Sequence, residues 1–157
     1  MVDFNLDGWP DLSVAMFDGD PMMSNSQPNQ LYQNLAGQFE NVTERAGMRD
    51  TGFAQGITVG DFNDDGFPDI FNANIGRNRL DRNNGDGTFT DVTNQVGLQG
   101  ESWTTSAGIA DITGDGLADL FEVQYCAGDA PYTKQCPSST DKNKIGSCSP
   151  LLFAAES

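Results

Sequence analysis

A nine-residue acidic pattern, D-x-[N/T]-x-D-G-x-x-D, occurs three times in the chain, over residues 3–11, 61–69 and 111–119. The copies begin 58 and then 50 residues apart, and a recurrence of this kind indicates similar structural units packed side by side. A second block, which begins at Asn29 and again at Asn78, recurs at an offset of 49 residues. The first unit holds about nine extra residues around 17–27, rich in Ser, Asn, Pro and Met, and these predict a surface loop.

Each unit is expected to form short strands. The middle unit predicts strands over residues 56–60, 69–74, around Leu80 and over 88–92, with a hairpin turn at 83–87. The third unit predicts strands over 108–110 and 119–123, and a single helical turn is expected only near 42–47. Four strands in about 50 residues is the spacing of a β-propeller blade. The sequence therefore predicts an all-β fold of blades with four antiparallel strands, a partial propeller of about three repeat units over residues 1–125.

The acidic pattern itself predicts a metal site. Positions 1, 3 and 5 carry short oxygen-bearing side chains, Gly at position 6 permits a backbone reversal, position 7 offers a carbonyl, and the Asp at position 9 returns from the next strand. Oxygen donors without nitrogen or sulfur select a hard cation, and several flexible carboxylates favour Ca²⁺ over Mg²⁺. We expect up to three Ca²⁺ ions. The predicted ligands are Asp3, Asn5, Asp7, Trp9 and Asp11, then Asp61, Asn63, Asp65, Phe67 and Asp69, and finally Asp111, Thr113, Asp115, Leu117 and Asp119.

The acidic pattern allows two other interpretations. The turns could be plain Asx turns without an ion, but three carboxylates within roughly 4 Å repel one another by about 1–4 kcal/mol per pair, which favours a compensating cation. An EF-hand needs Glu at position 12 between two helices, and that position holds Val14, Asn72 and Glu122. The EF-hand is therefore rejected, and the third turn is expected to be the weakest site because Thr113 is a neutral ligand.

The apolar residues beside the acidic turns are expected to fill the blade core. They alternate with the predicted ligands along the chain. They are Phe4, Trp9, Leu12, Phe62, Phe67, Ile70, Ile112, Leu117 and Leu120. By this hypothesis, an ion fixes the same turn whose neighbouring side chains form the core.

Composition excludes several classes of function. The formal net charge is -15 and the chain contains no histidine, which argues against nucleic-acid binding through a basic patch and against docking on anionic lipid. A His-based catalytic triad is excluded as well. The apolar runs are too short to insert into a membrane. A carboxylate pair such as Asp64 and Asp65 could suggest hydrolysis, but metal ligation explains these acids better, so we predict that the chain is not an enzyme.

The segments around the middle turn resemble a known repeat family. Residues 53–61, Phe-Ala-Gln-Gly-Ile-Thr-Val-Gly-Asp, are similar to the start of FG-GAP and VCBS repeats of integrin-α-like β-propellers. The block over 78–93 resembles the cartilage acidic protein and ASPIC/UnbV group of those repeats. The resemblance implies a secreted or cell-surface protein with Ca²⁺ in its blade loops, acting in adhesion or recognition. Because such propellers close with more blades, we expect a fragment, or a chain whose open sheet edges are completed by other protein chains.

Residues 126–157 depart from the repeat. They contain Cys126, Cys136 and Cys148, without a CxxC pair, so a zinc site is not favoured. One disulfide in an oxidising compartment is expected, with Cys136–Cys148 the favoured pair, followed by the start of a further strand near 150–155. Asn41 begins a glycosylation sequon.

The function predicted from sequence is that of an extracellular calcium-binding propeller segment in adhesion, recognition or assembly, in which calcium stabilises the blades. Other protein chains are the expected partners. One alternative is a calcium-dependent carbohydrate-binding module, for which an exposed aromatic such as Trp103 or Tyr132 would bind a glycan. Another alternative is an accessory domain of a larger secreted enzyme.

Overall fold

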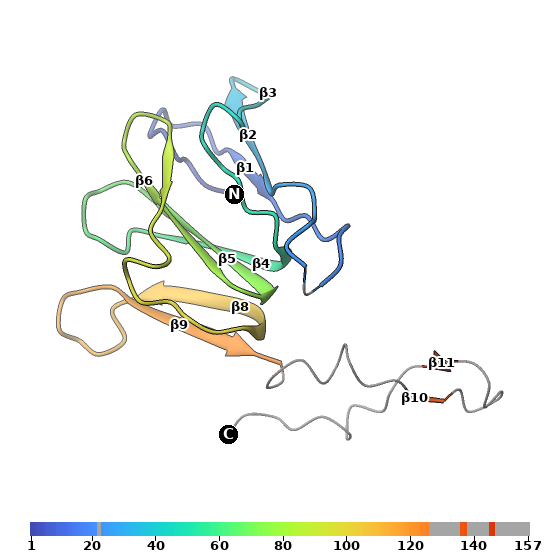
Figure 1. Ribbon diagram of the computed structural model, residues 1–157. Helices are drawn as coiled ribbons and strands as arrows, with labels where there is room; N and C mark the ends of the chain where they lie inside the picture. Colours follow the sequence, from blue (N-terminus) through green and yellow to red (C-terminus); the bar gives the residue numbers. More distant parts are fainter. Residues whose placement is uncertain (22, 126–135, 138–144, 147–157) are drawn as a thin grey trace.

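The computed structural model describes residues 1–21, 23–125, 136–137 and 145–146 (Figure 1). This part of the chain consists of strands and turns, without a helix, and so without a helix that could cross a bilayer. The strands are β1 (Leu12–Val14), β2 (Gln30–Leu35), β3 (Gln38–Asn41), β4 (Phe53–Gly60), β5 (Asp69–Gly76), β6 (Arg79–Asn83), β7 (Phe89–Asp91), β8 (Ser102–Ala110), β9 (Asp119–Gln124), β10 (Cys136–Pro137) and β11 (Ile145–Gly146).

The middle unit has the four antiparallel strands that the sequence predicted. Strand β4 pairs with β5, β5 with β6 and β6 with β7, in chain order. In the register of β4 and β5, Val59 lies opposite Ile70 and Thr58 opposite Phe71. Strand β5 has neighbours on both edges and is buried along its whole length. The all-β prediction and the four-stranded unit are thus confirmed.

The flanking units repeat parts of this arrangement. Strands β1, β2 and β3 form an antiparallel sheet, and an isolated bridge joins Val2 to Asp11 beside it. Strands β8 and β9 form the hairpin of the third unit. The end of β5 pairs briefly with β8, with Ile75 opposite Trp103, and Figure 1 shows β8 and β9 lying beside β4 and β5.

Two apolar cores lie between successive units. The first joins the first and second units, and the rings of Phe4 and Phe89 meet there at 5.9 Å between centroids. The second joins the second and third units around Phe71. The first core contains Val2, Phe4, Leu31, Val42, Ala46, Met48, Ile70 and Phe89, and the second contains Phe71, Ala73, Leu80 and Val92, with Phe62, Leu98, Ala107, Ile109 and Leu120 packed against it. Each sheet therefore buries its face against the next sheet, which is how repeat units without individual cores are stabilised.

The prediction that every apolar residue beside an acidic turn fills the core was wrong for some positions. Phe4 and Ile70 are buried as expected, but Trp9 is 47% exposed, and Ile112 and Leu117 are exposed as well. Figure 1 shows these turns projecting beyond the ends of their sheets, and no second sheet of the described residues covers them. Phe67 is less exposed than these residues because its ring lies against Gly85 of the β6–β7 hairpin.

The extra residues of the first unit form a loop between β1 and β2, as predicted, and this loop reaches the second unit. The Ser26 amide donates to the carbonyl of Thr51, and the Thr51 hydroxyl donates to the carbonyl of Ser24. The expected helical turn near 42–47 is a hydrogen-bonded turn in which the Ala46 amide donates to the carbonyl of Val42.

The cysteine-containing segment is described only at β10 and β11, which pair as a two-residue ladder. The favoured disulfide Cys136–Cys148, the position of Cys126, the aromatic Tyr132 and the strand expected near 150–155 lie outside what the structure describes.

Candidate metal-binding turns

The three acidic turns share one backbone conformation. The glycine at position 6 has φ of 86° at Gly8, 88° at Gly66 and 87° at Gly116. Position 4 is also left-handed, with φ of 56° at Leu6 and 59° at Asp64. A branched apolar residue such as Leu6 is strained in this region by about 1–2 kcal/mol, and such strain persists only where the surrounding bonds fix the turn.

The carboxylate at position 1 organises each turn by accepting backbone hydrogen bonds. In the middle turn, the Asp65 amide donates to Oδ1 of Asp61 at 3.2 Å and the Gly66 amide donates to Oδ2 at 2.8 Å. The first and third turns have the same pair of bonds, to Asp3 and Asp111. The glycine allows the chain to reverse so that both amides point at one carboxylate.

The carboxylates at positions 5 and 9 also recur. Oδ1 of Asp65 accepts from the Phe67 amide at 2.9 Å, and Oδ2 of Asp69 accepts from the Phe62 amide at 3.0 Å. Equivalent bonds form in the other turns, at Asp7 and Asp11 and at Asp115 and Asp119. At position 3, Nδ2 of Asn63 donates to Oδ2 of Asp65 at 2.8 Å, so the side chains at positions 3 and 5 lie together.

The residue at position 9 is buried in the first two turns and only half-buried in the third. Oδ1 of Asp11 accepts from the Asn34 amide at 2.8 Å, and Oδ1 of Asp69 accepts from the Asn83 amide at 2.7 Å. Asp119 has no such partner among the described residues; it accepts only from the start of its own turn. Burial, followed by the nearby acids of the same turn, raises the pKa of Asp11 and of Asp69, although these backbone bonds oppose the rise. Bonds from the Thr113 and Ile112 amides lower the pKa of Asp119.

Two residues that were not predicted from the sequence, Asn34 and Asn83, support these turns. Besides their amides, their side chains contact the turn: Nδ2 of Asn34 donates to the carbonyl of Pro10, and Nδ2 of Asn83 donates to the carbonyl of Pro68. Nδ2 of Asn83 also donates to the carbonyl of Phe4, which joins the first unit to the second. Their recurrence at the 49-residue offset was the signal that could have found them.

The turns fit an oxygen-ligated cation in donor type and in the order of donors along the chain. Each turn presents carboxylate, amide or hydroxyl, and carbonyl oxygens, without nitrogen or sulfur donors. Asp3 and Asp7 lie near enough to Asp11 to raise its pKa. Within residues 1–21 and 23–125, no three carboxylate or thiol side chains converge closely enough to form a complete metal cage. The backbone amides hold the carboxylates in place instead.

The profile of the FG-GAP-like repeat matches residues 3–72 and 61–122, so that each match includes two successive acidic turns. The chain belongs to the FG-GAP-like repeat family. The four-stranded sheet β4–β7 is therefore an FG-GAP propeller blade, with its acidic turn between β4 and β5. Among curated proteins, none matches the chain.

A second cluster of buried polar residues links these FG-GAP units away from the turns. Asp50, which is buried, accepts hydrogen bonds from Nδ2 of Asn29 at 3.0 Å, from Nδ2 of Asn74 and from the Gly52 amide. Asn29 belongs to the first unit and Asn74 to β5 of the second, so one carboxylate connects the two. Burial raises the pKa of Asp50, and the bonds from Asn74 and Gly52 only partly oppose it.

The raised pKa values predict an unusual dependence of stability on pH. The folded state binds protons at Asp11, Asp50 and Asp69 more tightly than the unfolded chain, whose reference pKa is 3.8. The free energy of unfolding should therefore fall as pH rises from 3.8 through the raised values. Acids with lowered pKa, such as Asp119, lose their contribution only below 3.8 and do not act in this range.

The measurement is a set of melting curves in EDTA between pH 7 and about pH 4.5. We expect the melting temperature to rise on acidification, and Asp50→Asn should show a smaller rise because one of these groups is gone. A melting temperature that is constant or falls over this range would contradict the prediction.

Proposed function

We propose that the chain is a calcium-binding segment of an extracellular β-propeller that acts in adhesion, recognition or assembly and does not catalyse a reaction. The observation that carries the proposal is that three turns, far apart in the sequence, adopt the same left-handed backbone and hold their position-1 carboxylates with the same two amides. Surface turns that bind no ion are not expected to share this backbone and these hydrogen bonds at three separate places in the chain. The resemblance of residues 78–93 to the cartilage acidic protein and ASPIC/UnbV group supports the extracellular part of the proposal.

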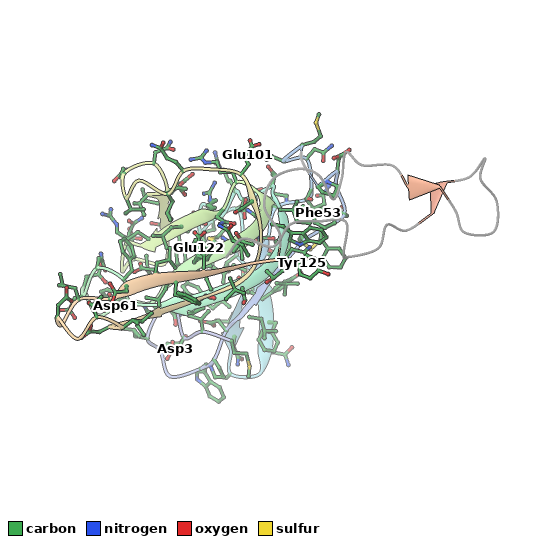
Figure 2. All side chains as sticks on the ribbon, turned by 90° about the horizontal axis from the view of Figure 1, so that it is seen from below. Asp3, Phe53, Asp61, Glu101, Glu122 and Tyr125 are labelled. Carbon is green, nitrogen blue, oxygen red and sulfur yellow. The ribbon has the colours of Figure 1, made fainter. Side chains whose placement is uncertain are left out.

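In the middle turn, Asp61, Asn63, Asp65 and Asp69 would hold the ion with the carbonyl of Phe67, and the same positions would do so in the other turns. A bound Ca²⁺ supplies the positive charge that offsets the repulsion between these carboxylates. Figure 2 shows Asp61 at the end of the molecule opposite to Phe53 and Tyr125, with Asp3 lower in the view. At ten times its dissociation constant, each ion would add roughly 1.4 kcal/mol to the free energy of unfolding.

Calorimetric titration with Ca²⁺, combined with melting curves in EDTA, tests the proposal. We expect up to three ions to bind, the third turn most weakly, and the melting temperature to fall on chelation. Mg²⁺ at the same concentration serves as the comparison, since a site built for Ca²⁺ tolerates it poorly. Absence of both a heat of binding and a change in melting temperature at millimolar Ca²⁺ would reject calcium binding.

A matched pair of variants assigns the middle site. Asp65→Asn should remove one ion from the titration, because Asp65 is a predicted ligand. Asp64→Asn makes the same change of charge at the preceding residue. Within the described residues the Asp64 side chain accepts no hydrogen bond, and its left-handed backbone suits asparagine. The proposal expects Asp64→Asn to keep the number of ions, and equal losses in the two variants would show only a general effect of charge.

The assembly part of the proposal rests on the outer face of the third unit. Phe121 of β9 and Tyr125, just after this strand, are 58% and 54% exposed, whereas Phe71 and Ile75, at the same repeat positions in β5, are buried. The third unit packs on this face of the second unit. The aromatic residues on the corresponding face of the third unit would suit the same kind of contact. We therefore assign this face to a further blade or to another protein chain, the partner class predicted from sequence.

A further inference from the structure

A pocket of about 160 Å³ lies at the end of β5 that is opposite to the acidic turn, and none of the predicted calcium ligands lines it. It is formed by the segment before β4, the turn between β5 and β6, and the end of β7, with the loop of the first unit at its rim. Its lining residues are Ser24, Arg49, Asp50, Thr51, Gly52, Arg77, Asn78, Arg79, Asp91 and Thr93.

The pocket brings arginines together, beside Asp50 and Asp91, on a strongly acidic chain. Three of the five arginines line it, although the net charge of the chain is -15. Arg79 is fixed in place: its Nε donates to both oxygens of Asp81 at 2.8 and 2.9 Å, and its Nη1 lies 3.4 Å from Oδ2 of Asp91. The guanidinium of Arg79 therefore has its charge partners within the protein.

The other two arginines retain free donors. Arg77 is exposed and donates from Nη2 to Oδ1 of Asn94 at 2.7 Å, which orients its guanidinium and leaves its remaining N–H groups open. Arg49 is exposed, and its side chain has no hydrogen bond or ion pair within the described part of the chain. A guanidinium presents five donors in a planar fork that matches a carboxylate.

Asp50 and Asp91 also line the pocket, and neither forms an ion pair with Arg49 or Arg77, although the charges of Arg77 and Asp91 interact at longer range. Asp50 is hydrogen-bonded to Asn29, Asn74 and Gly52, and Asp91 accepts from the amide and hydroxyl of Thr93. Glu101 and Glu122 line an adjoining pocket with Arg77 but lie beyond ion-pair distance of it. What remains for a ligand is a small pocket with two sets of free cationic donors.

We propose that this pocket binds a single carboxylate group of a protein partner, held between Arg49 and Arg77. Its volume suits one side-chain carboxylate or one chain-terminal carboxylate. The negative field of the whole chain would repel a polyanion such as a sulfated glycan, whereas an isolated carboxylate carries only one charge into it. The site would be one means of the recognition proposed above, and it rests on that function without requiring calcium.

The experiment follows the Arg Nε–Hε signals by nuclear magnetic resonance during titration of the whole chain with N-acetyl-glutamate amide, in EDTA and again in Ca²⁺, at constant ionic strength. We expect saturable shifts at Arg49 and Arg77 and none at Arg45 or Arg82, which lie outside the pocket. Arg49→Gln and Arg77→Gln should each weaken binding by about tenfold, the loss of one charged hydrogen-bonded contact, and the matched variant Arg82→Gln should not.

Arg49 and Arg77 are both exposed, so these variants should melt at the temperature of the unchanged chain, which separates lost binding from lost folding. Shifts that do not saturate, or that affect all arginines equally, would overturn the proposal. A heparin oligosaccharide that competes more strongly than the glutamate probe would overturn the assignment to a protein carboxylate. Failure here with an intact Ca²⁺ titration would reject the pocket alone, and failure of the Ca²⁺ titration with intact carboxylate binding would reject only calcium.

Discussion

Asp69→Ala is expected to lower the free energy of unfolding by about 2–4 kcal/mol in EDTA, where no ion contributes. Asp69 is fully buried, and its two oxygens accept from the amides of Phe62 and Asn83. Truncation leaves both amides without an acceptor, and each buried unsatisfied group costs about 1–3 kcal/mol. We place the effect in the lower part of the summed range because burial already raises the pKa of Asp69, so removal of the carboxylate also relieves part of a desolvation cost.

The third turn provides the control for this experiment. Asp119 occupies the same repeat position, but it is half-buried at most and its partners Ile112 and Thr113 lie on an exposed turn. Water can replace the lost acceptor there, so Asp119→Ala should cost about 0.5 kcal/mol or less. Urea unfolding of both variants in EDTA measures the difference. Equal losses would show that the buried bond from Asn83 is not what distinguishes the two positions.

Phe71→Ala is expected to cost about 3–5 kcal/mol, the range for truncation of a large aromatic residue in a packed core. Phe71 is fully buried at the centre of the second core, between the second and third units. The cavity would open between two sheets that bury these faces mainly against each other. Because each unit depends on its neighbour, the loss should appear in the whole unfolding transition.

Phe121→Ala is the matched control, since Phe121 has the same place in the third unit and is 58% exposed. It should change the free energy of unfolding by less than about 1 kcal/mol at low protein concentration. Urea unfolding at several protein concentrations tests both variants. A large and concentration-dependent loss in Phe121→Ala would show that copies of the chain already cover this face, and a small loss in Phe71→Ala would contradict the packing of the second core.

The repeat, the strands and the acidic turns could be predicted from the sequence because each depends on short-range chemistry. In the middle turn, the bonds to Asp61 come from residues four and five positions away, so the order of Asp, Asn and Gly dictates the conformation. The β-branched and aromatic residues of β4 and β5 similarly indicate strands from the sequence alone.

Burial was decided only by the tertiary structure, because the same sequence pattern meets different neighbours. Phe71 and Phe121 occupy equivalent positions, yet one is in a core and the other is exposed, since a sheet covers β5 and none covers β9 among the described residues. The bonds of Asn83 to the first unit and of Asn29 to Asp50 join residues 79 and 21 positions apart. The position of Arg49, Arg77 and Arg79 around one pocket also depends on the tertiary structure. No local sequence pattern predicts it, because the packing of separate segments brings the three side chains together.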